Sequence, residues 1–396
     1  MVEEYFYNGS LEKIKSITES LNAERVFIVH GKNSFSLSGA EDKIKNSCWD
    51  IRFDSFTDFS PNPTFEEVLK GIDSFKKENY DLVMAVGGGS AIDVAKLINI
   101  FSFQKFTPER YILKEKEMEI RGKPFLAAPT TAGTGSEATH FAVIYMDNKK
   151  YSVAHQYILP DYVILDPELT LTLPKYQTAC TGMDALCQGI ESYWSVNSSE
   201  ESKKYARTAI ELTLDNIVKA VEEPDDLEVR KNMMEGANYS GKAINISKTT
   251  APHACSYVIS SKCGIPHGHA VAIMMKEFIR YNGENYDRVV DERGEEYVRS
   301  VMDELHTMLG CRGPKEASEF FAGKIEEVEL ENSLRKVCKE LDVEEFVEGV
   351  NLERLENNPL SLNRQELNNI FSRWLQINED DQAIFEDETH EYGDKR

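Results

Sequence analysis

The sequence predicts an α/β domain with a doubly wound parallel sheet, followed by an all-helical domain. Three observations predict this. Strand, glycine-rich turn and helix alternate up to Pro174. From Lys175 onward helical periodicity continues almost throughout. The 396 residues are also too many for one ordinary core. We expect an α/β domain at 1–174, a helical domain at 175–377 and an acidic tail at 378–396.

Elements of the first domain follow from local patterns. The run DLVMAV is a continuous apolar strand of the kind that parallel sheets bury. SPNPT supplies an N-cap signal before the amphipathic stretch FEEVLKGIDSFKKE. The segments 141–146 and 151–166 suggest a hairpin-like excursion that ends in the return strand YVILD. We expect strands at 24–30, 49–56, 81–86, 125–128 and 162–166, a loop at 31–39, and helices at about 40–47, 65–78 and 91–101.

Charge and composition exclude several classes of function. The net charge of −23 argues against nucleic acid or an anionic membrane as a partner. An anionic substrate would need a locally positive pocket. No apolar run approaches a membrane span, and the acidic, polar start is not a signal peptide. Seven cysteines without a CxxC pair fit free thiols, so we expect a cytoplasmic protein.

A glycine-rich turn, Gly87-Gly88-Gly89-Ser90, follows the apolar strand and opens a helix. Glycines let the backbone approach an anion, and the N–H groups of the first helical turn supply donors. The turn is not the GxGxxG fingerprint, because Ile92 stands where the third glycine belongs, and it is not a Walker loop. It therefore predicts a pyrophosphate cradle or a plain flexible turn. Asp93 either caps the helix or contacts a cofactor.

A second loop of small residues, PTTAGTGSEAT, follows the next strand. Ser/Thr-rich turns are common without any ligand. Two such loops at the ends of parallel strands are better explained by one nucleotide lying across the carboxyl edge of the sheet.

Three of the eight histidines fall between Lys248 and Met275. Two helices with a break at Gly264 and Pro266 could bring His253 and His267 to one point. Asp184 is a candidate third ligand, and Gln188 lies one turn further on the same helix face. The alternative is that the histidines cap or pack helices and that Asp184 is an ordinary helix acid. His269 could equally pack a helix.

Five motifs, GGGSAIDVAK, PTTAGTGSEAT, LPDYVILDPELTLTLP, TGMDAL and HGHAVAIMM, together resemble the iron-dependent (group III) alcohol dehydrogenase family. The resemblance covers about residues 24–374. It implies a nucleotide-binding α/β domain and an all-helical domain, as in the related dehydroquinate synthase fold. It also implies NADH or NADPH as cofactor, one divalent metal in the cleft (Fe²⁺ by family habit, with Zn²⁺ also accepted), and a homodimer.

Residue roles carry over from this resemblance by position. The residues implied to hold the pyrophosphate and nearby groups are Gly87, Gly88, Gly89, Ser90 and Asp93. Those implied to line the adenine and nicotinamide side are Thr130, Thr131, Thr134 and Ser136, with Lys150 near the cofactor. Asp184, His253 and His267 match three of the four family metal ligands.

The sequence departs from the family at three positions. The fourth ligand is a histidine in the family and Gln188 here, so Gln188 coordinates, a water replaces it, or metal is lost; we expect metal to be retained. Tyr257 stands where the family often has a further histidine. Gly31 replaces an acid that many NAD-preferring members carry, and Lys32 follows, so NADPH is permitted.

The strings DALCQGIESYWS and KTTAPHACSY are similar to the phosphonoacetaldehyde reductase branch of this family. That branch implies hydride transfer from a reduced nicotinamide to an aldehyde, which gives 2-hydroxyethylphosphonate in phosphonate biosynthesis. The metal would act as a Lewis acid on the carbonyl oxygen. Lys248, Thr249 and Thr250 would anchor the phosphonate. His269, Tyr257 or a water would supply the proton. Lys248 could also be an ordinary solvated lysine.

Three other hypotheses remain. The first is a dehydrogenase of the same family that acts on a neutral aldehyde such as lactaldehyde or butanal. The second is a lyase related to dehydroquinate synthase, which would need a site rich in Lys and Arg that the sequence does not show. The third, prompted by Gln188, is a degenerate dehydrogenase kept as a binding protein.

Overall fold

The computed structural model describes residues 2–147, 149–338 and 342–373. The chain folds into two compact units, Met1–Thr249 and Thr250–Arg396. Each unit is described by itself. The domain boundary expected after residue 174 stays a prediction, and the expected tail at 378–396 lies outside the described residues.

The first unit contains a six-stranded sheet in which every pairing is parallel, with strand order β1-β8-β5-β4-β2-β3. Its strands are β1 (Glu3–Phe6), β2 (Arg25–His30), β3 (Arg52–Phe56), β4 (Leu82–Gly87), β5 (Phe125–Pro129) and β8 (Tyr162–Leu165). A separate antiparallel pair consists of β6 (Phe141–Met146) and β7 (Lys149–Ala154).

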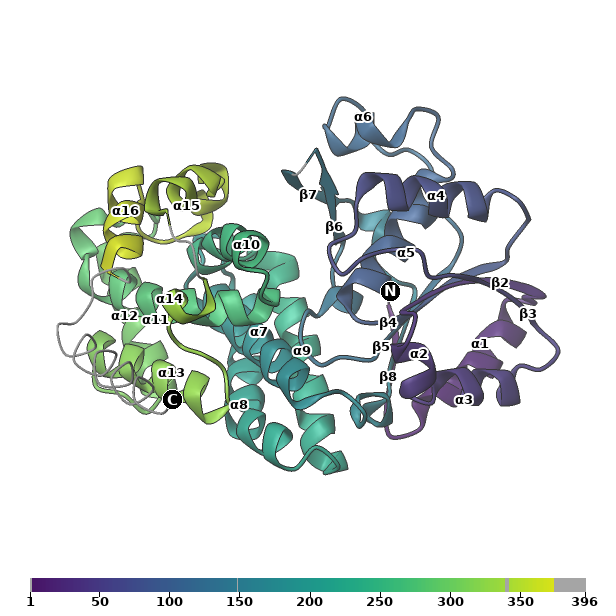
Figure 1. The fold of residues 1–396 in the computed structure, drawn as a ribbon, viewed down its shortest axis with the longest axis horizontal. Coiled ribbons are helices and arrows are strands. Elements are labelled where there is room, and N and C mark those ends of the chain that lie inside the picture. Colours follow the sequence, from purple (N-terminus) through teal and green to yellow (C-terminus); the bar gives the residue numbers. More distant parts are fainter. Residues whose placement is uncertain (1, 148, 339–341, 374–396) are drawn as a thin grey trace, which may run out of the picture. The chain divides into compact units, whose positions relative to one another are not determined.

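Helices cover both faces of this sheet, as Figure 1 shows. Alternation along the central strands decides which side chain meets which layer. Phe27 and Val83 pack with α4 (Phe65–Phe75) and α5 (Gly89–Phe101), whereas Val26 and Met84 pack with α1 (Lys13–Ser20) and α3 (Ala40–Ser47). The helices of this unit are α1 (Lys13–Ser20), α2 (Ser34–Leu37), α3 (Ala40–Ser47), α4 (Phe65–Phe75), α5 (Gly89–Phe101), α6 (Pro108–Ile112), α7 (Lys175–Trp194), α8 (Glu200–Glu222) and α9 (Leu227–Ser247).

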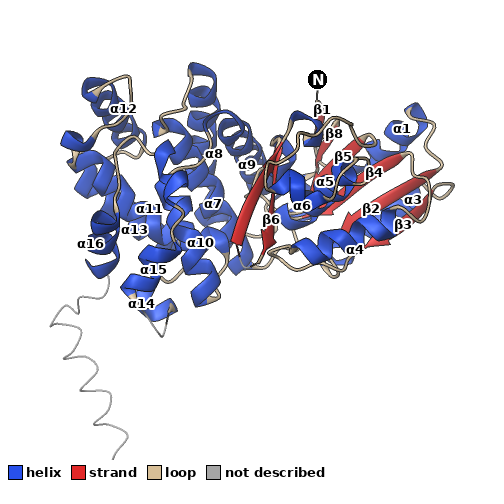
Figure 2. Cartoon of the chain, turned by 90° about the horizontal axis from the view of Figure 1, so that it is seen from above, coloured by secondary structure: helices blue, strands red, loops and turns tan. Residues whose placement is uncertain are grey.

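The described residues of the second unit form helices and no strand (Figure 2). These are α10 (Ala251–Cys263), α11 (His267–Glu284), α12 (Glu295–Met308), α13 (Pro314–Glu327), α14 (Leu334–Val337), α15 (Val343–Gly349) and α16 (Arg364–Arg373), with a 3₁₀ turn η6 (Leu352–Asn357). Within the described residues, no helix combines the length and the apolar character that crossing a membrane requires.

The predicted fold class is confirmed, and each predicted strand and helix of the first domain has a counterpart. The prediction missed β1, because EEYF is short and polar and becomes a strand only by pairing with β8 at the edge of the sheet. It also missed α1, α6 and α2, which is a single turn inside the expected loop 31–39.

One prediction about the cysteines is wrong. Cys263 and Cys338 form a disulfide with an S–S distance of 2.16 Å, whereas the other five remain thiols: Cys48, Cys180, Cys187, Cys255 and Cys311. The bonded pair is 75 residues apart, so no local spacing could reveal it. The fold brings the last residue of α10 next to the residue that follows α14, with their Cα atoms 4.8 Å apart.

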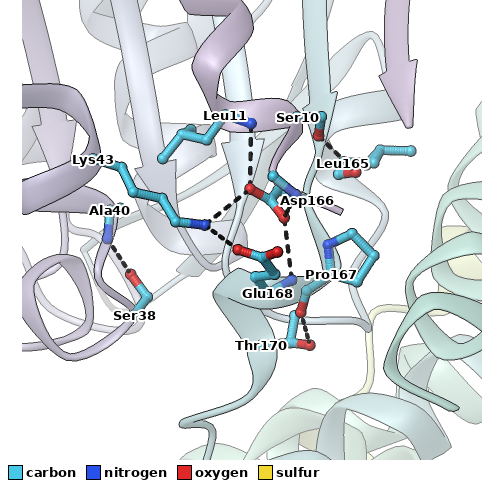
Figure 3. Close-up of polar contacts among 11 residues, drawn as sticks. Ser10, Leu11, Ser38, Ala40, Lys43, Leu165, Asp166, Pro167, Glu168 and Thr170 are labelled. Atoms are coloured by element: carbon cyan, nitrogen blue, oxygen red, sulfur yellow. Dashed lines mark hydrogen bonds and ion pairs between the residues drawn. The ribbon is translucent and has the colours of Figure 1, made fainter. Parts of the chain in front are cut away.

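A buried carboxylate joins the N-terminal segment to the end of β8 (Figure 3). Asp166 is completely buried and accepts hydrogen bonds from the backbone N–H groups of Gly9 at 2.8 Å, Leu11 at 3.2 Å and Glu168 at 3.2 Å. The ammonium of Lys43 lies 3.4 Å from it. In the motif LPDYVILDPEL, Asp166 therefore has a structural role.

We expect Asp166→Ala to lower the free energy of unfolding of the first unit by about 3 kcal/mol, because three backbone donors lose their acceptor in a buried place. Urea unfolding followed by circular dichroism measures this loss. The exposed Asp58, which pairs with Lys70, is the control, and Asp58→Ala should cost under about 0.5 kcal/mol. Equal costs for the two variants would contradict the anchoring role.

Candidate functional site

The glycine-rich turn connects the buried strand β4 to α5, with Gly88 as the N-cap residue. A methyl group on Gly89 would meet the side chain of Thr134 at 2.7 Å, and one on Gly88 would lie 3.4 Å from Thr131. The two predicted loops are therefore in contact at the carboxyl edge of the sheet. The N–H groups at the start of α5 are available to an anion there.

The second loop is held tightly by helices of the same unit. Gly135 has φ 59°, and a methyl group on it would meet the Cα of Gly241 on α9 at 2.4 Å. One on Gly133 would meet the Cβ of Thr181 on α7 at 2.5 Å. Thr130 is buried, and its N–H donates to the carbonyl of Gly87 at 3.0 Å. Only glycine permits these approaches.

Asp93, predicted to cap the helix or contact a cofactor, accepts hydrogen bonds from two residues of the same unit. One carboxylate oxygen accepts from the Ser136 hydroxyl and the other from the N–H of Val143 at 2.9 Å. Burial raises the pKa of Asp93, and the charge of Lys96 opposes this rise. In this structure Asp93 and Ser136 therefore tie α5 to the second loop.

Lys96 was not predicted as a functional residue. It is 1% exposed, and its ammonium donates to the carbonyls of Ser136 at 2.6 Å, Thr139 at 2.8 Å and Phe141 at 2.9 Å. Burial lowers the pKa of Lys96 to about 8. A signal was present, because this lysine falls on the apolar face of AIDVAKLINIF.

The remaining predicted cofactor residues lie around these loops. Ser90 donates its hydroxyl proton to the carbonyl of Pro61. Lys150 is half-buried on β7, paired with Tyr145 on β6, and its charge helps to oppose the rise in the pKa of Asp93. The structure thus brings the loop residues and Lys150 to one region of the first unit.

Two histidines meet in the second unit. The rings of His253 on α10 and His267 at the start of α11 are 5.2 Å apart between centroids. Ser256 donates to the carbonyl of His253 at 2.8 Å, so its oxygen can accept from Nδ1–H of His267 at 3.3 Å. This arrangement favours the His267 tautomer in which Nε2 is the nitrogen that can bind a metal ion.

The predicted carboxylate ligand completes a possible metal set. Asp184, His253 and His267 each offer one ligand atom, and these atoms all lie within 4.8 Å of one another. One carboxylate and two imidazoles suit Fe²⁺ or Zn²⁺. Burial, with the charges of Glu191 and Asp184, raises the pKa of the neighbouring Cys187. The residues present therefore fit a divalent ion.

Gln188, the predicted fourth ligand, lies one turn beyond Asp184 on α7 and is buried. Its side-chain oxygen is 2.9 Å from the hydroxyl of Ser240 on α9. A carbonyl oxygen has two lone pairs, so this contact orients the amide and leaves one lone pair for a ligand. Coordination by Gln188 stays a prediction.

The two candidate proton donors have different surroundings. Nε2 of His269 donates to the carbonyl of Glu331 at 2.7 Å, and burial lowers the pKa of this histidine. The ring of Tyr257 stacks on that of His267 at 5.2 Å between centroids, and its oxygen accepts from Arg354 at 3.2 Å. Tyr257 is thus beside a ligand histidine, whereas His269 holds a loop.

Near the end of α9, the charges of neighbouring basic side chains act on His140. Lys248, the residue after this helix, is exposed and has φ 61° and ψ 172°, a conformation that is essentially confined to glycine. Asn245, one turn earlier, accepts the N–H of His140 at 2.8 Å. Burial and the charges of Lys96, Lys248 and His155 lower the pKa of His140. We call His140, His155 and Lys248 the basic group.

Of the predicted anion anchors, Lys248 belongs to this basic group. The helix α10 begins just after these residues, at Ala251, with Thr250 as its N-cap residue. Thr250 is buried and Thr249 is half-buried. Sequence reasoning missed His140, although it directly follows the second loop.

Comparisons with known proteins agree with this geometry. The sequence profile of the iron-containing alcohol dehydrogenases matches residues 3–167, and that of the C-terminal part of the Fe-containing alcohol dehydrogenase family matches residues 178–375. The NADPH-dependent butanol dehydrogenase of Clostridium saccharobutylicum is 31% identical over 389 residues, 93% of this chain and 95% of that protein. The chain therefore belongs to the iron-containing alcohol dehydrogenase family, whose members are NAD(P)-dependent alcohol dehydrogenases and aldehyde reductases.

Two further relatives act on anionic aldehydes by name. The phosphonoacetaldehyde reductase of Streptomyces viridochromogenes is 31% identical over 242 residues, 58% of this chain and 60% of that protein. The crystal structure of sulfoacetaldehyde reductase from Bifidobacterium kashiwanohense in complex with NAD⁺ has a TM-score of 0.84 and 29% identity, covering 95% of this chain and 98% of that one. The chain spans only 38% to 58% of three other curated relatives, which are 30% to 35% identical to it.

We expect Gly89→Ala to raise the Kd for NADH and NADPH on the order of 10-fold, because the added methyl group displaces Thr134 and with it the second loop. Fluorescence titration of the reduced cofactor measures this constant. Gly323→Ala, where an added methyl group meets nothing within 4 Å, is the control and should leave Kd unchanged. An unchanged Kd for Gly89→Ala would place the cofactor elsewhere.

We expect His267→Ala to remove the bound divalent ion, and Ser256→Ala to weaken metal binding by roughly 10- to 100-fold because the His267 ring loses its orienting partner. Elemental analysis of the purified protein and titration with Fe²⁺ or Zn²⁺ measure both effects. His155→Ala, outside the ligand set, should retain one ion per chain. Full metal content in His267→Ala would refute the assignment.

Proposed function

We propose that the protein reduces phosphonoacetaldehyde to 2-hydroxyethylphosphonate with NADH or NADPH and a divalent metal, as a step of phosphonate biosynthesis. The observation that carries this proposal is the basic group at the end of α9, in a chain of net charge −23. An acidic surface repels anions, so a local cluster of cationic and imidazole groups has a reason to exist if the substrate is an anion. The relatives named for phosphonoacetaldehyde and sulfoacetaldehyde support the same class of substrate.

Each part of the proposed site has a defined task. The N–H groups at the start of α5 and the packed glycine loops bind the dinucleotide phosphates. Asp184, His253 and His267, with Gln188 as a candidate, hold the ion. When bound, the ion polarises a carbonyl group and the reduced nicotinamide supplies the hydride. Lys248 attracts the phosphonate by its charge, and a ring N–H of His140 can donate a hydrogen bond to it, which together orient the aldehyde.

The product alcohol needs one proton. Tyr257 is the better placed of the two candidate side chains, because its ring stacks directly on His267. His269 already uses Nε2 for a hydrogen bond to the carbonyl of Glu331, which supports Tyr257 as the donor. Water remains the third source.

The structure at Gly31 is compatible with NADPH. A methyl group at this position would lie 2.3 Å from the hydroxyl oxygen of Ser34, which would have to rotate away. Lys32 is exposed beside it. With no acid at position 31, nothing at this position repels a 2′-phosphate.

The alternative is a family member that reduces a neutral aldehyde. The butanol dehydrogenase match favours this hypothesis, because it covers far more of this chain than the phosphonoacetaldehyde reductase match does. Rates of NADH and NADPH oxidation with phosphonoacetaldehyde, sulfoacetaldehyde, lactaldehyde and butanal separate the two hypotheses. A kcat/KM for phosphonoacetaldehyde below that for butanal would refute the proposed substrate.

Two variants of Lys248 test the anion anchor without confusing charge with strain. Lys248→Gly and Lys248→Ala both remove the ammonium, so we expect both to lower kcat/KM for phosphonoacetaldehyde, relative to butanal, by roughly 10- to 100-fold through KM. Only Lys248→Gly relieves the backbone, by about 1–3 kcal/mol, and should therefore unfold at a higher temperature than Lys248→Ala.

Lys242→Ala is the matched control, because this lysine also lies on α9 but pairs with Glu4 at 2.7 Å. It should leave the ratio of the two kcat/KM values unchanged. An equal loss of activity towards charged and neutral aldehydes in the Lys248 variants would remove the anchor from the proposal.

A further inference from the structure

An arginine of the second unit stands close to the ligand histidines. Arg354 lies in η6, and one of its guanidinium nitrogens donates to the phenol oxygen of Tyr257 at 3.2 Å. The guanidinium carbon is 5.1 Å from the centroid of the Tyr257 ring. That ring in turn stacks on His267, with an angle of 15° between the planes. Arg354 therefore contacts the same aromatic ring that stacks on a ligand histidine.

The short segment that carries Arg354 is capped at its start and anchored to α11 at its end. Asn351 caps it by accepting the N–H of Glu353 at 3.0 Å. Asn358, immediately after it, is completely buried and exchanges two amide hydrogen bonds with Asn282 of α11, at 3.0 and 3.3 Å. Since α11 also carries His267, the position of Arg354 relative to His267 is fixed by buried contacts and not by a flexible loop.

Among the described residues, no acidic side chain forms an ion pair with Arg354. Arginines of the same unit such as Arg280, Arg299 and Arg312 pair with glutamates one helical turn away. Arg354 forms no such ion pair among the described residues, although Glu353 and Glu356 are close in sequence. It is half-buried, and its hydrogen-bond partner is a neutral phenol. A guanidinium in such a place keeps most of its donors for an anion.

We propose that Arg354 recognises the anionic group of the substrate, a tetrahedral phosphonate or sulfonate, and that Tyr257 positions its guanidinium beside His267. The planar fork of an arginine matches two oxygens of such a group. The inference rests on the proposed function in assuming an aldehyde that carries an anion. It also explains the tyrosine at position 257, because a phenol accepts from the guanidinium, whereas a protonated histidine would repel it.

Calorimetric titration tests this inference without requiring turnover. The probes are ethylphosphonate and ethanesulfonate, added to metal-loaded enzyme saturated with NADPH. We expect Arg354→Gln to raise the Kd of the bound anion on the order of 10- to 100-fold. Arg354→Lys should lose less, because it keeps the charge but not the fork. Arg335→Gln, an exposed arginine of α14, is the control and should leave Kd unchanged.

Tyr257→Phe provides a second, gentler variant in case Arg354→Gln unfolds, since it keeps the ring and removes only the oxygen. It should raise the Kd of the same anion by roughly 3- to 10-fold. Binding of ethylphosphonate alone or ethanesulfonate alone supports the inference and identifies the anion. The inference is overturned if the wild type binds neither probe, or if folded Arg354→Gln and Tyr257→Phe bind both as the wild type does.

Failure of the proposed function gives a different result. If the wild type prefers butanal to phosphonoacetaldehyde, yet Arg354→Gln still loses affinity for the probes, the substrate assignment fails and the anion-recognising role of Arg354 stands.

Discussion

The close packing of the second small-residue loop is the constraint on which the proposed cofactor site depends. Gly135 and Gly241 approach so closely that neither tolerates a methyl group, and Gly133 has the same relation to Thr181. These contacts fix the loop against α9 and α7. Thr181 is one turn before Asp184, so the helix that supports the loop also places the carboxylate. Cofactor loop and carboxylate ligand are thus parts of one rigid arrangement within the first unit.

Much of the fold and part of the candidate site could be predicted from the sequence. Continuous apolar strands followed by glycine turns predict a parallel sheet because their period and their termini are local properties. Asp184, His253 and His267 could be proposed because their motifs are local as well. The strand β1 could not be predicted, because it forms only by pairing with β8, whose residues lie almost 160 positions later. Glu3, for example, pairs with Tyr162. The same holds for the disulfide, whose cysteines are far apart in sequence.

The residues that the sequence did not reveal act through tertiary contacts. Nothing local distinguishes Arg354 from the other arginines, and only the stacked Tyr257 and the buried Asn282–Asn358 pair place it near His267. His140 is held near the end of α9 by a hydrogen bond from its backbone N–H to Asn245, 105 residues later. Each carboxylate oxygen of Asp93 accepts one hydrogen bond, from Ser136 or from Val143, and its contact with a cofactor stays a prediction. Pattern reasoning finds residue types, whereas packing decides which of them face a ligand.

The buried ammonium of Lys96 carries a consequence of its own. Three N–H groups of the ammonium serve two carbonyls in the second loop and one just after it, and an uncharged amine has only two N–H groups to offer. Because burial lowers the pKa of this lysine to about 8, mildly alkaline solution leaves one carbonyl without its donor. The end of the second loop, around η2 (Ser136–Ala138), then has one hydrogen bond fewer. The pH of the solution therefore affects how firmly this part of the proposed cofactor site is held.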